Sequence, residues 1–293
     1  MTARMRGRGR LVPYAFIAPN LLLFTAFSFV PLIYAVYISL HDWSLIGDSE
    51  YLGLGNYLRL VRDRLFWQAL GNTLVYAAVT VSASMAAGLL LAVGLNRALL
   101  GRTVLRSLYF MPIVISAVAT GTIAAWLFND NYGVVNGLLV QLGVGRIAWL
   151  STPRWALASL AIATVWVRVG FNMVIYLAAL QSIPRNYYEA AQLDGAKPVQ
   201  QFRYVTVPLL MPATFLLLVL NIIYSFQVFD LIYVMTGGGP GFSTTMVVQY
   251  IYQSAFGTSE MGYASAMGVV LYVLILGFTV VQWRASRQSE SVL

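Results

Sequence analysis

The chain of 293 residues is 59% hydrophobic and only 10% charged, whereas about a quarter of the residues of a typical soluble domain are charged, so the composition excludes a water-soluble globular protein. It has no cysteine and one histidine, which excludes disulfides, thiol nucleophiles and a cluster of transition-metal ligands. Its net charge of +8 is spread over basic residues that separate apolar segments, a distribution that favours orientation in a lipid bilayer over nucleic-acid binding.

Six apolar segments follow one another along the chain, and each supplies the roughly 20 apolar residues that a helix needs to cross a bilayer core. The sequence therefore predicts an all-α membrane protein with six transmembrane helices, built as a single transmembrane domain over residues 1–293. Prolines at positions 13, 19 and 31 predict a first span that is kinked or that begins with a short interfacial segment. The expected spans are at about 14–40, 72–95, 107–128, 155–180, 206–233 and 262–283.

The loop between the first two spans contains apolar residues at helical spacing. These are Leu58, Val61, Leu65 and Phe66, with Trp67 beside them. The pattern predicts a short helix that lies on the outer membrane interface.

Basic residues divide unequally between the two sides of the predicted membrane. Twelve of the 18 lie at the termini and in the loops of one side, five lie on the other side, and Arg168 lies within the fourth span. The excess of basic residues in cytoplasmic loops puts both termini in the cytoplasm. The segment 184–208, between the fourth and fifth spans, is then cytoplasmic as well.

The fourth span contains Arg168, Asn172 and Tyr176 at four-residue steps, which puts their side chains on one face of a helix. An ionisable group inside a span is a functional candidate by default. The arginine could bind a phosphate, as in a glycerol-phosphate or glycerophosphodiester solute, or it could bind backbone carbonyls at a broken helix.

The segment 184–208 is polar although apolar spans lie on both sides of it. Pro184 suits a first helical position, and residues 186–193 are good helix formers. Gly195 stands where the end of a helix requires left-handed backbone geometry. The sequence predicts a short helix followed by a glycine elbow.

A second short helix is predicted after the elbow. Pro198 can open it, residues 199–204 continue it, and Pro208 ends it as the fifth span begins. In the first of the two helices, Ala190 and Ala191 form a flat face onto which another protein could pack. An ordinary structured loop is the alternative interpretation.

The fifth span contains further polar side chains that suit the hydroxyl groups of a sugar. Together with Arg168, Asn172 and Tyr176, they are candidates for a substrate pathway. The alternative is that they form hydrogen bonds between helices and stabilise packing. These residues are Asn221, Tyr224 and Gln227, with Asp230 closer to the outer end.

The order Glu189-Ala190-Ala191, three residues, Gly195, nine residues and Val205-Thr206-Val207-Pro208 resembles the EAA loop of bacterial ABC importer permeases. That family usually ends the motif with Ile-x-Leu-Pro, and this chain has valine at both aliphatic positions. Other short motifs are similar to the sugar-importer branch, and the last of them to the MalF/UgpA-type member of a permease pair. They are Asp194-Gly195-Ala196, Phe171-Asn172-Met173, Gln181-Ser182-Ile183-Pro184 and Thr236-Gly237-Gly238-Gly239-Pro240.

The resemblance covers about residues 14–283 and implies the type I ABC importer permease fold in a bacterial cytoplasmic membrane. It implies partners: two ATPase subunits that bind ATP and magnesium, a second homologous permease and an extracytoplasmic solute-binding protein. No cofactor is expected in this chain. In such importers this segment, the coupling loop, docks into a groove on the ATPase. The residues implied for this role are Glu189, Ala190, Ala191, Asp194, Gly195 and Pro208.

The chain lacks the motifs of ATPases, hydrolases and metalloproteases. A phosphate-binding loop requires G-x-x-x-x-G-K-[ST], and the one lysine, Lys197, precedes a proline. Neither G-x-S-x-G nor H-E-x-x-H occurs. We therefore expect a transport protein that is not an enzyme. The alternatives are a self-sufficient secondary transporter or channel, for which only Asp230 offers a carboxylate near a span, and an intramembrane enzyme.

Overall fold

The computed structural model describes residues 8–44, 49–97 and 99–290, and the contacts within the chain divide it into two compact units. Met1–Asp63 and Ile251–Tyr272 form the first unit, and Arg64–Tyr250 and Val273–Leu293 form the second. The prediction of a single domain stays a prediction.

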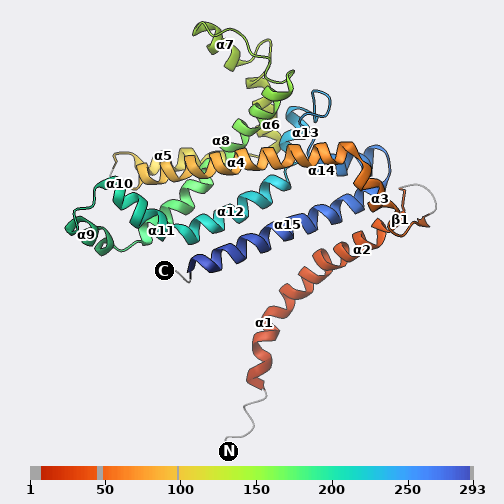
Figure 1. Cartoon of the computed structure of the whole chain (residues 1–293), viewed down its shortest axis with the longest axis horizontal. Helices are drawn as coiled ribbons and strands as arrows, with labels where there is room; N and C mark the ends of the chain where they lie inside the picture. Colours follow the sequence, from red (N-terminus) through yellow and green to blue (C-terminus); the bar gives the residue numbers. More distant parts are fainter. Residues whose placement is uncertain (1–7, 45–48, 98, 291–293) are drawn as a thin grey trace, which may run out of the picture. The chain divides into compact units, whose positions relative to one another are not determined.

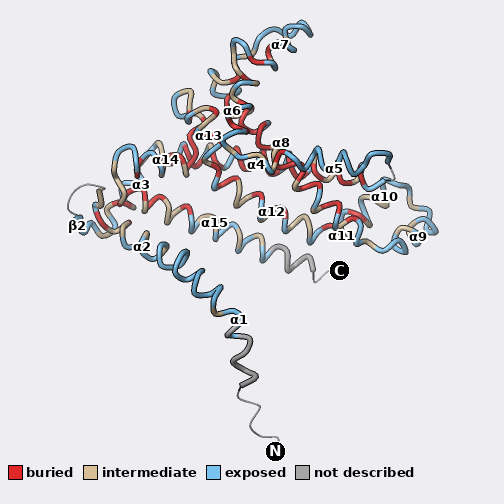
Figure 2. The backbone as a smooth tube through the Cα atoms, turned by 180° about the vertical axis from the view of Figure 1, so that it is seen from behind, coloured by how far each residue is buried: buried red, intermediate tan, exposed pale blue. Residues whose placement is uncertain are grey.

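The first unit begins with an apolar helical segment. Between Phe16 and Ser39 nearly every described side chain is exposed or only partly buried (Figure 2), because apolar residues surround the helix on all sides and no single stripe faces a core. A π-helical turn interrupts it just before Pro31, and the predicted kink or interfacial start of the first span stays a prediction. The segments are α1 (Arg8–Phe24), η1 (Thr25–Phe29) and α2 (Val30–Ser39).

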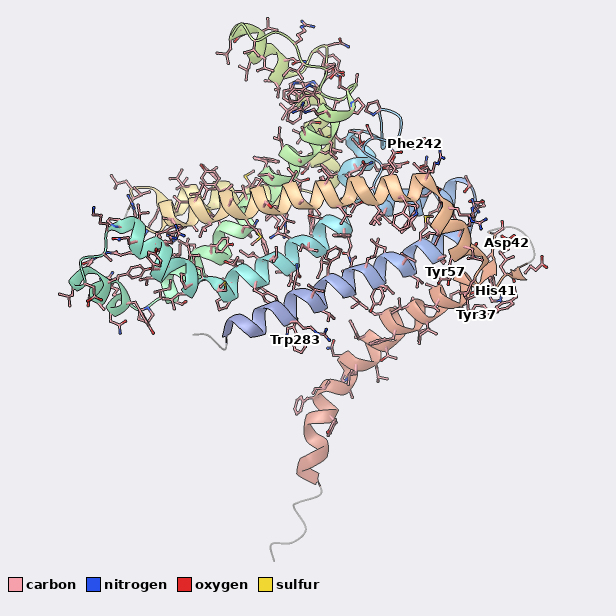
Figure 3. All side chains as sticks on the ribbon, in the orientation of Figure 1. Tyr37, His41, Asp42, Tyr57, Phe242 and Trp283 are labelled. Carbon is pink, nitrogen blue, oxygen red and sulfur yellow. The ribbon has the colours of Figure 1, made fainter. Side chains whose placement is uncertain are left out.

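A small hairpin and a short helix follow in the same unit, where Tyr37, His41 and Tyr57 lie close to one another (Figure 3). The hairpin pairs β1 (His41–Asp42) with β2 (Glu50–Tyr51), and the helix is α3 (Gly55–Arg62). A short helix therefore exists where one was predicted, and its place on the outer membrane interface stays a prediction. It ends at Asp63, however, so the expectation was wrong for Leu65, Phe66 and Trp67, which lie in the next helix.

The start of the last helix is held against α3 and this hairpin by contacts of Glu260 and Gly262. Arg59 forms a bidentate ion pair with Glu260, and both N···O distances are 2.9 Å. Gly262 lies so close to the hairpin that a Cβ atom there would be 2.1 Å from the His41 carbonyl oxygen. A glycine is required at this position by packing.

The core of the second unit consists of two long helices and a shorter one, α4 (Arg64–Leu95), α8 (Pro153–Ser182) and α12 (Met211–Phe226) (Figure 1). Two glycines allow close contact. A Cβ atom at Gly88 would lie 2.6 Å from the Asn172 Cβ, and one at Gly170 would lie 1.9 Å from the Tyr109 carbonyl oxygen. Small residues are typical of tightly packed membrane helices.

The predicted third span, 107–128, is broken. The chain bends by 101° between η2 and α6, which the sequence interpretation did not predict. Pro112 cannot donate a backbone hydrogen bond, and Ser116 caps a new helix with its hydroxyl, which together end one helix and start another. The segments are α5 (Arg102–Phe110), η2 (Met111–Val114), α6 (Ala117–Leu127) and α7 (Val134–Gln141).

The predicted fifth span, 206–233, is also interrupted. The second helix of the loop continues beyond Tyr204 and Pro208, and the chain bends by 63° at Leu210. Pro212 lacks the N–H that a straight helix would need. A second break follows Phe226. The segments that flank α12 are α10 (Pro198–Gln201), η3 (Phe202–Thr206), α11 (Val207–Leu209) and α13 (Asp230–Met235).

The chain ends with α14 (Val247–Tyr252), η4 (Gln253–Gly257) and α15 (Met261–Glu290). Among the described residues, four helices are long and apolar enough to cross a membrane, and the number is six if each bent pair counts as one span. This agrees with the predicted all-α membrane protein and its six spans.

Candidate functional site

The coupling loop folds as a helix, a glycine elbow and a second short helix, as predicted. Pro184 precedes α9 (Arg185–Leu193) as its N-cap. Gly195 has φ +81°, and the amide of Ala196 donates to the Ala191 carbonyl at 2.8 Å. These bonds satisfy carbonyls at the helix end, and only glycine adopts this φ without a steric penalty.

The loop presents charged and apolar side chains to its surroundings. Glu189 and Ala190 are exposed, Ala191 is half-buried, and Asp194 caps the C-terminal end of α9. Leu193 is 90% exposed and Val199 is 76% exposed, and the sequence interpretation did not single out either residue. Exposed apolar side chains beside an exposed carboxylate are typical of a protein-binding surface.

The loop is braced against the start of the fifth span. The hydroxyl groups of Tyr188 and Thr206 are 3.0 Å apart, and the Gln201 side chain donates to the Ala196 carbonyl at 2.9 Å. Pro208 lies in α11, just before the bend at Leu210. The loop is therefore continuous with α12 through a short, bent helical segment.

Three of the predicted pathway residues form a buried hydrogen-bonded chain between α8 and α12. The Arg168 Nε donates to the Asn221 Oδ1 at 3.1 Å, and the Asn221 Nδ2 donates to the Asn172 Oδ1 at 2.8 Å and to the Leu217 carbonyl at 2.7 Å. Asn172 is fully buried and Asn221 is 2% exposed. These two amides contribute to helix packing.

Tyr176 lies one turn farther along α8 and is 2% exposed. Tyr176, like Asn172 and Asn221, therefore lies among packed helices and lines none of the cavities described below. A role for these three residues in a substrate pathway stays a prediction.

The guanidinium of Arg168 contacts the faces of two aromatic rings. Its central carbon is 4.7 Å from the centre of the Phe171 ring and 4.5 Å from that of the Tyr224 ring. Such cation–π contacts stabilise a desolvated cation by about 2 kcal/mol. Within the described part of the chain no carboxylate lies within ion-pair distance of Arg168.

Arg168 and the remaining predicted pathway residues line two neighbouring cavities. The smaller, of about 190 Å³, is lined by Arg168 and the larger, of about 250 Å³, by Gln227 and Asp230. Both are lined by Tyr224, and also by Ala117 and Leu231. These two adjacent cavities thus contain four predicted pathway residues in their walls: Arg168, Tyr224, Gln227 and Asp230.

The cavities form where the broken third span meets the broken fifth span. Interrupted helices at membrane depth occur where the backbone is enclosed by protein or lines a cavity. The sequence interpretation missed Thr120 and Thr164, which also line the smaller cavity. Threonines are common in packed membrane helices, so no feature of the sequence could have identified them.

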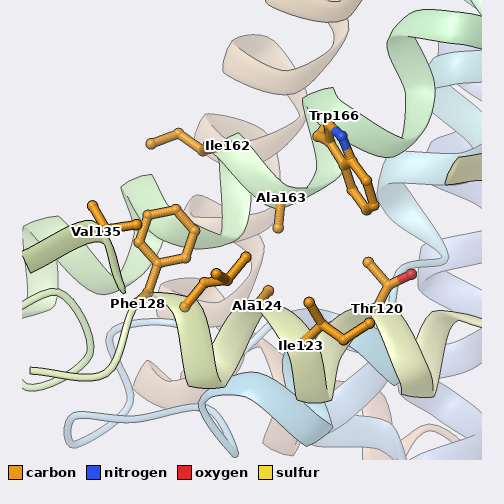
Figure 4. A pocket seen from close by; sticks show the side chains of 9 residues that line it. Thr120, Ile123, Ala124, Phe128, Val135, Ile162, Ala163 and Trp166 are labelled. Carbon is orange, nitrogen blue, oxygen red and sulfur yellow. The ribbon is translucent and has the colours of Figure 1, made fainter. Parts of the chain in front are cut away.

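A third cavity, of about 270 Å³, lies between α6 and α8 and is apolar apart from the Thr120 hydroxyl and the Trp166 indole nitrogen (Figure 4). Ile123, Phe128, Ile162 and Trp166 are among its lining residues. It offers almost no hydrogen-bonding group to a sugar. Among the described residues, no group of three acidic or histidine side chains could hold a metal ion.

The sequence is similar to a family of transport proteins. Residues 84–287 match the family described as binding-protein-dependent transport system inner membrane component. The chain is 36% identical to the trehalose/maltose transport system permease protein MalF of Thermococcus litoralis, over 98% of this chain and 97% of that protein. It is 35% identical to the sulfoquinovosyl glycerol transport system permease protein SmoG of Agrobacterium fabrum, over 96% and 92%.

The fold is similar to that of a solved importer. The structure of a bacterial alginate ABC transporter in complex with an alginate pentasaccharide-bound periplasmic protein contains a chain that matches with a TM-score of 0.84. The match covers 96% of each chain at 25% identity.

Proposed function

Because this chain belongs to the family of binding-protein-dependent transport system inner membrane components, a multi-pass permease family of ABC importers, we propose that it carries a carbohydrate across the cytoplasmic membrane by alternating access. The type I importer permease fold and the sugar-permease relatives agree with the resemblance inferred from the EAA loop. The observation that carries the proposal is the continuity between the coupling loop and the helix that lines the cavities.

That continuity supports a mechanism in which ATP-driven motion reaches the cargo. In this mechanism α9 contacts an ATPase subunit through Glu189, Ala190 and Ala191. ATPase subunits that close as rigid bodies would therefore move α9. The Tyr188–Thr206 contact passes the displacement to the bent segment before α12. Helix α12 carries Tyr224, which lines both cavities. A movement of the loop that reaches α12 would therefore change the shape of the cavities.

The cargo is proposed from the site and from the relatives. Tyr224 offers an aromatic face on which a sugar ring can stack, while Gln227 and Asp230 offer hydrogen-bonding groups for its hydroxyls. Relatives are named for trehalose and maltose, for sulfoquinovosyl glycerol and for starch degradation products. A glycerol-phosphate or glycerophosphodiester cargo is a narrower proposal, since it requires Arg168 to receive a phosphate.

The proposed assembly contains two ATPase subunits, a second homologous permease and an extracytoplasmic solute-binding protein. The ATPases would bind ATP and magnesium, and this chain would carry out no chemical step. The distribution of basic residues supports cytoplasmic termini, and the exposed first helix supports packing against another membrane chain or lipid.

Uptake into proteoliposomes separates this proposal from a self-sufficient secondary transporter. Vesicles with the complete complex, solute-binding protein and internal ATP should accumulate a carbohydrate from a panel that includes maltose and trehalose. Omission of the ATPase should abolish accumulation. Uptake that persists without the ATPase, or that follows an ion gradient, would contradict the proposal and favour a secondary transporter.

A further inference from the structure

Arg168 is a buried cation whose charge the described residues leave uncompensated. It is 8% exposed, its Nε is bound to Asn221, and no hydrogen bond from its Nη atoms to a described residue is found. A buried charge without a counter-charge is costly, and the contacts with Phe171 and Tyr224 offset only part of that cost. Because Arg168 lines the smaller cavity, an anion inside it could supply the missing charge.

A helix N-terminus lies at the wall of the same cavity. Ile115 and Ala117, on either side of the N-cap residue Ser116, both line it. The Ser116 hydroxyl accepts from the Ala119 amide at 3.2 Å, so one amide of the first turn is capped. The amides before it have no carbonyl partner within α6, and the helix dipole gives this end a partial positive charge.

Thr120 supplies an independent indication of a ligand. It lies one turn along α6, lines the cavity and is 2% exposed, and its Oγ1 has no hydrogen-bond partner. Its hydroxyl points away from Ala163 and Phe128 of the neighbouring apolar cavity (Figure 4). A buried hydroxyl without a partner is unusual and calls for a bound polar group.

Among the residues that line the smaller cavity, Arg168 carries a positive charge and none carries a negative charge. No carboxylate lines it, and Thr164, the other hydroxyl in its wall, is 2.6 Å from the Tyr76 hydroxyl. Asp230 lines the larger cavity, and Tyr224 belongs to the walls of both. The lining of the smaller cavity therefore suits an acceptor-rich group, and the lining of the larger one suits hydroxyls.

We propose that the smaller cavity binds the anionic group of an acidic carbohydrate, a carboxylate, sulfonate or phosphate, between Arg168 and the N-terminus of α6. The inference rests on the proposed function and narrows its substrate class. The oxyanion would accept from the guanidinium and from Thr120, and the sugar ring would extend past Tyr224 toward Gln227 and Asp230. A neutral sugar would leave the Arg168 charge uncompensated.

The test compares two probes that differ only at one carbon. Galacturonate carries a carboxylate where galactose has a hydroxymethyl group, and inorganic phosphate serves as a second oxyanion. Titration calorimetry on the purified complete complex, at matched ionic strength, should show galacturonate binding at least about tenfold more tightly than galactose, as a charge-assisted hydrogen bond implies.

Substitutions assign the preference to its residue. Arg168→Gln should remove the preference for galacturonate, and Arg168→Lys should keep most of it because the positive charge stays. Arg154→Gln is the matched control, since Arg154 is an exposed arginine in the first turn of the same helix and lines neither cavity. It should leave the preference unchanged.

Several results would overturn the inference: equal affinities for the two sugars, a preference that survives Arg168→Gln, or binding of neither galacturonate nor phosphate. ATP hydrolysis by the same samples distinguishes this failure from failure of the proposed function. An active complex without anion preference would contradict only the anion site. A chain that purifies without an ATPase would contradict the importer itself.

Discussion

The coupling loop and the smaller cavity lie in the same unit, but they are specified in different ways. The loop is made by sequence neighbours: Pro184 opens α9, Gly195 ends it, and its determinants lie within 25 residues. The walls of the cavity come from three separate stretches of the sequence: η2 with α6, then α8, and then α12 with α13. A local motif can therefore be recognised from sequence alone, whereas the cavity depends on how the helices pack.

The largest expected effect is at the loop, where Glu189→Lys reverses an exposed charge that the proposed ATPase contact requires. Reversal at a charge-paired interface costs about 2–5 kcal/mol, so ATP-driven uptake should fall at least about thirtyfold while the folded yield is unchanged. Uptake assays on proteoliposomes measure this. Glu50→Lys, the same change at an exposed residue of the hairpin, which is predicted on the outer side, should have no effect.

Next is a packing change in the core, Gly170→Ala. The added Cβ would meet the Tyr109 carbonyl oxygen at 1.9 Å and push the broken third span away from α8. Overpacking of this kind costs about 1–3 kcal/mol and should lower the thermal unfolding midpoint of the purified chain. Gly71→Ala, where nothing lies within 4 Å, is the control. An equal midpoint for both variants would contradict the observed packing.

A smaller effect is expected from Asn221→Leu, which is similar in size but removes the centre of the buried hydrogen-bonded chain. It leaves the Arg168 Nε and the Asn172 Oδ1 without their partner, at a cost of about 1–3 kcal/mol. Because transmembrane hydrogen bonds average at the low end of such values, we expect a loss near 1 kcal/mol in chemical unfolding. Asn131→Leu, at an exposed position, should change stability little.

An effect of similar size to that of Asn221→Leu is expected from Gly195→Ala. No atom lies within 4 Å of the added Cβ, so only the backbone at φ +81° opposes the change, at about 1 kcal/mol. Coupled uptake should fall only severalfold, and Gly195→Asn should be milder because asparagine tolerates left-handed geometry better. A loss as large as that of Glu189→Lys would show that Gly195 has a role beyond the turn.

The sequence predicted the existence of the spans and the conformation of the loop because both depend on local composition. It did not predict the 101° bend between η2 and α6, although Pro112 and Ser116 in retrospect indicate it. The helical spacing of Arg168 and Asn172 placed them on one face correctly. Spacing could not distinguish a packed face from a cavity wall, since Asn172 is buried against α12 whereas Arg168 also lines the cavity.

The central claim is that α9 contacts the ATPase, and the absence of native cysteine makes it directly measurable. A single cysteine in Leu193→Cys, treated with a thiol–amine cross-linker in the assembled complex, should link the 32.3 kDa chain to an ATPase subunit. Leu142→Cys, an exposed leucine that ends α7 and is predicted on the outer side, should give no such product. Equal cross-linking at the two positions, or none at position 193, would contradict the account.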